Sequence, residues 1–71
     1  MFFRIREIRK QHGLTQKEQA ALLGIPYSTY RRYDSGQAAP PLSVLIRFAD
    51  LYHISTDYLM GRTDDPTPRR T

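Results

Sequence analysis

The segment Thr15-Gln-Lys-Glu18 is the feature that most constrains how this chain folds. The Thr15 hydroxyl can accept a hydrogen bond from the Glu18 amide while the Glu18 carboxylate reaches back to the Thr15 amide, and this reciprocal capping box fixes the start of a helix. Gly24 marks the end of that helix, because glycine tolerates the left-handed backbone that closes many helices. The pattern predicts a helix from Gln16 through Leu23.

A second helix is predicted directly after this turn. Pro26 suits a helix start. Proline lacks a backbone N–H group, and at this position the N–H group of any residue would have no acceptor within the helix. Residues 27–35 follow, with Tyr30 and Tyr33 expected on the inner face. Two short helices joined by a tight glycine turn predict a helix-turn-helix arrangement over residues 16–35.

Three further helices are predicted from apolar spacing and from capping residues. The first ends at Gly13, and its apolar residues recur every third position: Phe2, Ile5 and Ile8. The fourth has apolar residues at three- and four-residue steps: Leu42, Leu45, Ile46, Ala49 and Tyr52. Ser55 is a suitable N-cap for a last short helix that ends at Gly61, with Leu59 facing inward.

The length and composition favour one small all-α domain. The chain has 71 residues and no cysteine, so packing rather than disulfides must stabilise it. No alternating apolar run indicates a strand. We expect a compact five-helix domain over residues 1–61. Residues 62–71 contain two prolines and nothing apolar to bury, which predicts a flexible C-terminal tail.

The charge of the chain points to a polyanionic partner. The formal net charge is +4, and residues 1–37 carry seven Lys or Arg against three Asp or Glu. No apolar stretch is long enough to span a membrane. Charges interrupt the N-terminus where a signal peptide needs its apolar run, so we expect a cytoplasmic chain.

The outer face of the third predicted helix is where such a partner would bind. Tyr27, Ser28, Arg31 and Arg32 fall on one stripe that packing does not require. A helix fits the major groove of B-DNA, where Arg can bond guanine O6 and N7 in bidentate fashion. The spacing therefore favours a helix that reads base edges.

Two stretches of the chain resemble the Cro/phage-repressor (XRE-type) helix-turn-helix family of bacterial and phage transcription regulators. They read LTQKEQAALLGIPYSTYRRYDSG and P..L..L..FADLY.IS.DYLMG, and the resemblance covers residues 4–61. It implies a lambda-repressor-like DNA-binding domain whose helices 2 and 3 form the helix-turn-helix. It also implies a transcriptional repressor or regulator that binds a palindromic operator in double-stranded DNA as a homodimer.

The resemblance assigns roles to particular residues. Gln16 matches a residue that holds a DNA phosphate, and Lys17 is placed for a backbone contact. The expected DNA-binding set is Gln16, Lys17, Tyr27, Ser28, Thr29, Arg31, Arg32 and Gln37. Arg9 and Asp34 match a pair that clamps the first helix to the end of the recognition helix. The dimer interface is expected at Tyr52, Ile54, Tyr58 and Met60.

Four features depart from the family pattern. The loop Gln37-Ala38-Ala39 replaces one that is commonly rich in Lys or Arg, which predicts a shallower salt dependence of DNA binding. Gln19 stands where Leu or Val is usual, so the second helix is expected to be held less tightly. Tyr30 replaces a typical Ile or Val, so the core beneath the recognition helix must accommodate a ring. Pro26 takes the usual Ser or Thr cap position and removes one phosphate donor.

A protein-interaction module on the same frame, such as the antitoxin of a toxin–antitoxin pair, is the alternative function. Leu22, Tyr58 and Met60 would then mark the partner surface. An enzyme is the least favoured class, because no paired carboxylates, nucleophile dyad or phosphate loop is present. His12 and His53 lack partners at metal-ligand spacing, and we expect no cofactor and no small-molecule ligand.

Overall fold

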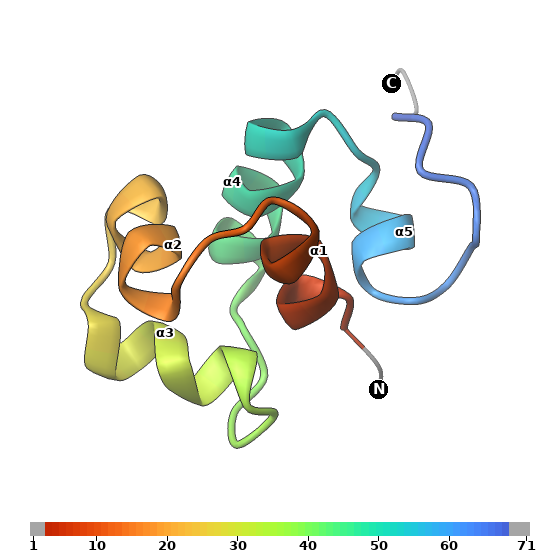
Figure 1. Cartoon of the computed structure of the whole chain (residues 1–71). Coiled ribbons are helices and arrows are strands. Elements are labelled where there is room, and N and C mark those ends of the chain that lie inside the picture. The colour runs from red at the N-terminus through yellow and green to blue at the C-terminus, as the bar shows by residue number, and fades with distance from the viewer. Residues whose placement is uncertain (1–2, 69–71) are drawn as a thin grey trace. The chain divides into compact units, whose positions relative to one another are not determined.

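The computed structural model describes residues 3–68, and within these residues it contains five α-helices and no strand (Figure 1). The helices are α1 (Ile5–Gln11), α2 (Gln16–Leu23), α3 (Tyr27–Asp34), α4 (Leu42–Tyr52) and α5 (Thr56–Leu59). The predicted all-α fold with five helices is confirmed. The chain divides into two compact units, one carrying α1 to α3 and the other carrying α4 and α5. No helix in the described part of the chain has the length and apolar character needed to cross a bilayer.

The capping box forms at the start of α2 as predicted. The Glu18 amide donates to Thr15 Oγ1 at 3.1 Å, and the Thr15 amide donates to Glu18 Oε1 at 2.9 Å. The helix ends at Gly24, whose φ of 71° lies in the left-handed region that favours glycine. These two local signals fix both ends of the helix without help from the rest of the fold.

The first unit, residues 5–40, is built on α3. Both α1 and α2 pack against this helix, and the short turn from α2 (orange) into α3 (yellow to green) is visible in Figure 1. The apolar residues that this unit buries are Ile5, Ile8, Ala20, Leu23 and Tyr30. Gln19 is fully buried as well, although it is polar. Phe2, the other residue of the predicted apolar face of α1, lies outside the described residues.

The inner face of α3 differs from the prediction at one position. Tyr30 has no exposed surface, as expected, but Tyr33 is only half-buried. Asp34 takes the inward position one turn after Tyr30, because it pairs with a buried arginine of α1. The apolar pattern selected Tyr33 for that face, although the expected pair of Arg9 and Asp34 already required Asp34 to face α1.

Two of the five apolar residues whose spacing predicted α4 lie at the surface. Leu42 is 63% exposed and Ile46 is 44% exposed, so neither belongs to the core. The buried face consists instead of Val44, Leu45, Phe48 and Ala49. Tyr52 is half-buried, and its ring packs on Phe48 with 5.0 Å between the ring centroids.

The second unit closes on the short helix α5 and on the segment after it. The Ser55 hydroxyl accepts a hydrogen bond from the Tyr58 amide, which confirms the predicted N-cap. Leu59 is fully buried, as predicted. The Ser55 amide donates to the Pro66 carbonyl at 2.9 Å, so the chain returns alongside the start of this helix.

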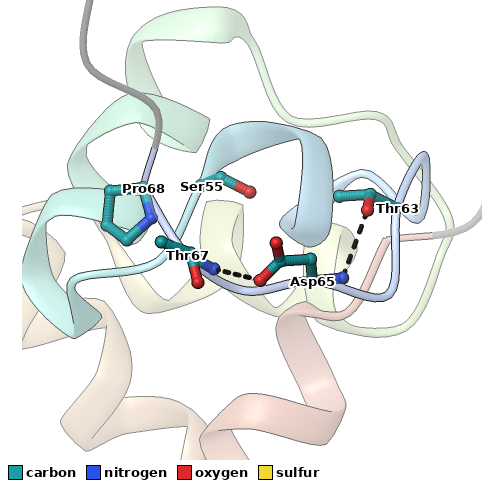
Figure 2. Close-up of a pocket in the computed structure, with 5 residues that line it drawn as sticks. All are labelled: Ser55, Thr63, Asp65, Thr67 and Pro68. Carbon is teal, nitrogen blue, oxygen red and sulfur yellow. Dashed lines mark hydrogen bonds between the residues drawn. The ribbon is translucent and has the colours of Figure 1, made fainter.

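Residues 62–68 of the predicted tail make contacts in the structure. The Arg4 guanidinium donates to Asp64 Oδ1 at 2.7 Å, and the Asp65 amide donates to Thr63 Oγ1. Figure 2 shows the polar pocket that this segment encloses, lined by Ser55, Thr63, Asp65, Thr67 and Pro68. Residues 69–71 of the predicted tail lie outside the described residues, and tail flexibility stays a prediction.

Candidate nucleic-acid interface

The outer face of α3 is an exposed polar stripe. Ser28, Arg31 and Arg32 are exposed, and Tyr27 at the start of the helix is 38% exposed. Thr29 is half-buried beside them. The buried residues of this helix are Tyr30 and Asp34, whereas Ser28, Arg31 and Arg32 are exposed and are not needed for packing. The stripe therefore offers two guanidinium groups, a hydroxyl and a phenol to a partner.

Side chains from α2 and from the loop after α3 border this stripe. The Lys17 ammonium lies over the Tyr27 ring, 5.5 Å from its centroid, which brings a cation from α2 to the start of α3. Gln37 is exposed, and its backbone N–H donates to the Arg32 carbonyl at 2.9 Å. Gln16, the first residue of α2, is half-buried.

A buried ion pair holds α1 against the end of α3. Arg9 Nε donates to Asp34 Oδ1 at 2.8 Å, and Arg9 Nη2 donates to Oδ2 at 3.2 Å. The side chains are 10% and 1% exposed, so both charges are removed from water. Arg9 Nη1 also donates to the Leu14 carbonyl at 2.7 Å, which fixes the loop between α1 and α2.

Two further donors complete the surroundings of the Asp34 carboxylate. The Tyr30 hydroxyl donates to Oδ1 at 2.7 Å, and Gln16 Nε2 donates to Oδ2 at 3.0 Å. One carboxylate therefore accepts hydrogen bonds from α1, α2 and α3. Neither of these two bonds was predicted. Tyr30 and Asp34 lie four residues apart on one helix, a spacing that could have indicated the first bond, whereas no spacing signal links Gln16 to Asp34. We call Arg9, Gln16, Tyr30 and Asp34 the carboxylate cluster.

The cluster shifts the pKa values of both charged partners. Burial alone would raise the pKa of the Asp34 carboxyl, but the hydrogen bonds from Arg9, Gln16 and Tyr30 together outweigh it. The pKa of Asp34 therefore lies below its ordinary value of 3.8. The hydrogen bond to Asp34 raises the pKa of Arg9 further, against the opposing effect of burial. Both groups are charged at neutral pH.

The lowered pKa predicts how stability depends on pH. The ionised Asp34 carboxylate stabilises the fold fully above pH 3.8, its ordinary pKa, and this contribution is lost as the pH falls toward the lower folded-state pKa. We expect the free energy of unfolding, measured with urea, to fall as the pH drops below about 4. The Asp34→Asn variant should be less stable at pH 7 and show a shallower decline. An equal acid decline in both proteins would contradict this assignment.

The four residues predicted for a dimer interface are all partly buried in the chain itself. They are Tyr52, Ile54, Tyr58 and Met60. The Arg4 guanidinium stacks over the Tyr58 ring, 4.4 Å from its centroid. The remaining exposed surface of these side chains is what a second protein chain could contact.

No cluster of metal-ligating side chains accompanies these surfaces. In the part of the chain that the structure describes, no three His, Cys, Asp or Glu side chains gather to hold an ion. The chemistry on offer at α3 is hydrogen bonding and positive charge, which suits recognition of an anionic partner.

The helix pair, its buried crossing and its exposed polar stripe define a helix-turn-helix domain. The sequence matches the helix-turn-helix family over residues 5–59, and the chain belongs to this family in its XRE-type branch. The curated relatives of the chain are transcriptional regulators and include phage repressors.

Relatives match over most of this chain but extend well beyond it. The uncharacterized HTH-type transcriptional regulator YobD of Bacillus subtilis is 44% identical over 66 residues, which are 93% of this chain and 59% of YobD. The CTXphi transcriptional repressor RstR of Vibrio cholerae is 37% identical over 83% of this chain and 53% of its own length. A crystal structure of a transcriptional regulator from Listeria innocua superposes with a TM-score of 0.73 at 34% identity, covering 86% of this chain and 61% of that one. The chain thus spans a little over half the length of these relatives.

Proposed function

We propose that this chain binds double-stranded DNA sequence-specifically and regulates transcription as a repressor, with α3 in the major groove of an operator. The observation that carries the proposal is the exposure of Ser28, Arg31 and Arg32 on one side of a helix whose other side is buried. A helix presented in this way fits the major groove, and Arg is the side chain best suited to guanine. The family membership supports the same function.

The proposed DNA contacts fall into two groups, contacts to phosphates and contacts to base edges. Gln16 and Lys17, at the start of α2, bind phosphates and set the register of the domain on the duplex. The residues that read base edges are Tyr27, Ser28, Arg31 and Arg32, with Thr29 and Gln37 at the margins of the contact. Phosphate contacts carry no sequence information, so the specificity comes from α3.

The proposal includes a homodimer on DNA and a cytoplasmic location. Tyr52, Ile54, Tyr58 and Met60 each keep some exposed surface that a second copy of the chain could cover. Dimers of this architecture bind half-sites about 34 Å apart, one turn of the double helix. The operator should then be an inverted repeat.

Selection of bound sequences from a random DNA pool tests the function, and Arg32→Ala tests the mechanism. We expect selection to return an inverted repeat. Against that sequence, Arg32→Ala should lose about 1–3 kcal/mol of binding free energy, because a bidentate contact to guanine is removed. Its affinity for unrelated duplex should change little. Fluorescence anisotropy at a fixed salt concentration measures both.

Arg6→Ala is the matched control for this variant. Arg6 is exposed on α1, so this change removes the same charge away from the outer face of α3. We expect a small loss, of equal size on all sequences, from this control. A uniform loss with Arg32→Ala as well would show that Arg32 contacts phosphate and does not read a base.

A protein-interaction module remains the second candidate, because Leu22 on α2 is 55% exposed. An apolar side chain at that exposure suits a protein partner better than a polyanion. Titration with random duplex DNA at low salt separates the two functions. Salt-sensitive binding supports the DNA-binding function, and the absence of binding supports the interaction module.

A further inference from the structure

The carboxylate cluster joins a buried ion pair to a residue at the proposed DNA contact. Gln16 is the first residue of α2, and its side chain reaches the carboxylate of Asp34 at the last position of α3. The cluster therefore connects the start of one helix of the motif to the end of the other. A change in the cluster moves or releases a side chain that would face the DNA backbone.

The bond to Asp34 leaves Gln16 able to bind an anion. A carboxamide nitrogen carries two hydrogens, and Asp34 Oδ2 accepts one of them at 3.0 Å. At the same helix end, the capping box takes up the Glu18 amide through the Thr15 hydroxyl. The amides of the first two residues, Gln16 and Lys17, have no intrahelical acceptor in any α-helix. One side-chain hydrogen and two backbone amides are thus available to a phosphate.

We propose that Asp34 is a positioning residue that holds the Gln16 carboxamide ready for a DNA phosphate, and that the Tyr30 hydroxyl fixes the orientation of Asp34. This proposal rests on the proposed DNA-binding function for its consequence, but its geometry belongs to the protein alone. A free glutamine side chain must be immobilised on binding, which typically weakens affinity by about three- to tenfold. Asp34 removes that loss by ordering the side chain beforehand.

Tyr30 is linked to Gln16 through the carboxylate of Asp34. Its ring has no exposed surface, so its hydroxyl cannot touch the DNA. The hydroxyl donates to Oδ1 at 2.7 Å, the same oxygen that accepts from Arg9 Nε, while Gln16 binds Oδ2. Arg9 Nη2 also donates to Oδ2, at 3.2 Å. The two Arg9 donors and the Tyr30 hydroxyl therefore set the plane of the carboxylate, and the plane sets where Oδ2 holds Gln16. Removing one hydroxyl loosens that plane and leaves the ion pair in place.

The effect on DNA binding should be independent of sequence. Gln16 contacts a phosphate in this proposal, and phosphates are the same at every base step. If Gln16 is no longer held in position, the affinity for the operator and the affinity for random duplex should therefore fall by the same factor. A substitution on the base-reading face of α3 would weaken binding to the operator alone. Residues that read bases and residues that position a phosphate contact can therefore be distinguished by experiment.

The side-chain NMR signals of the free protein test the proposal without DNA. We expect the Gln16 carboxamide to be as rigid as the backbone by heteronuclear relaxation, whereas that of exposed Gln11 is mobile. Tyr30→Phe should make the Gln16 carboxamide mobile. Tyr33→Phe, which removes the same hydroxyl from a half-buried tyrosine of the same helix, should not. A Gln16 signal as mobile as that of Gln11 in the unaltered protein would overturn the proposal whether or not DNA is bound.

A double-mutant cycle on DNA binding tests the consequence. Tyr30→Phe should weaken binding to random duplex by about three- to tenfold, and it should have no effect in a Gln16→Ala background, because the side chain it positions is then gone. An equal loss in both backgrounds would show that Tyr30 acts through general stability and would refute the positioning role. A rigid Gln16 in a protein that binds no duplex would instead refute the proposed function and leave the positioning geometry standing.

Discussion

Asp34→Ala is expected to lower the free energy of unfolding by about 3–5 kcal/mol, because it leaves the buried guanidinium of Arg9 without its counter-charge. The Arg9 side chain is only 10% exposed and cannot turn into water without opening the contact between α1 and α3. The Tyr30 hydroxyl and the Gln16 carboxamide also lose their acceptor. Urea denaturation followed by circular dichroism measures the loss.

The loss is large compared with the stability of a domain of this size. The core of a domain of this length rarely supplies more than about 3–5 kcal/mol, so we expect this variant to be largely unfolded. A triple variant, Arg9→Met with Tyr30→Phe and Asp34→Leu, keeps the prediction testable, because it removes the two buried donors together with the acceptor and leaves only the half-buried Gln16 to turn toward water. We expect it to recover most of the lost stability, since apolar replacement of a complete buried ion pair is often neutral. If Asp34→Ala alone proved as stable as the unaltered protein, the ion pair would have no structural importance.

The helix-turn-helix could be predicted from the sequence because its signals are local. A capping box at Thr15 and a left-handed glycine at Gly24 fix the ends of α2 whatever surrounds them. The exposed stripe of Ser28, Arg31 and Arg32 follows from the same helix boundaries. Both the fold class and the candidate interface could therefore be predicted from the sequence.

Only two of the four residues of the carboxylate cluster were predicted from the sequence. The resemblance to a family paired Arg9 with Asp34, but it offered no reason to add Gln16 or Tyr30. The Gln16 bond depends on how α2 and α3 meet, and a sequence pattern does not contain that geometry, whereas the four-residue spacing of Tyr30 and Asp34 was open to prediction. Tyr30 was expected simply as a larger core residue, and its hydroxyl has a specific acceptor that a typical Ile or Val would not need.

The buried face of α4 could not be predicted from the sequence for a different reason. Eight of the eleven residues in LSVLIRFADLY are apolar, so more than one stripe of the helix has the expected spacing. Leu42 and Ile46 lie four residues apart, and so do Val44 and Phe48. Periodicity cannot choose between two apolar stripes of the same helix. Packing chooses, and it buries Phe48 completely while leaving Ile46 44% exposed.

Phe48→Ala is accordingly expected to lower the free energy of unfolding by about 3–5 kcal/mol, because it removes a fully buried ring and leaves a cavity. The Tyr52 ring, 5.0 Å away between centroids, would lose its aromatic neighbour as well. Ile46→Ala is the matched control on the same helix, and it should change stability by no more than about 0.5 kcal/mol. Denaturant midpoints for the two variants decide between the stripes.

A milder substitution at Phe48 keeps the test usable if Phe48→Ala does not fold. Phe48→Leu keeps an apolar side chain of similar volume in the same position and should lose about 1 kcal/mol, enough to measure in a folded protein. A larger loss from Ile46→Ala than from Phe48→Ala would mean that the stripe through Leu42 and Ile46 is the buried one. The orientation of α4 would then be rotated about its axis, and the aromatic pair of Phe48 and Tyr52 would be at the surface. The order of the two losses therefore reports directly which face of α4 supports the second unit.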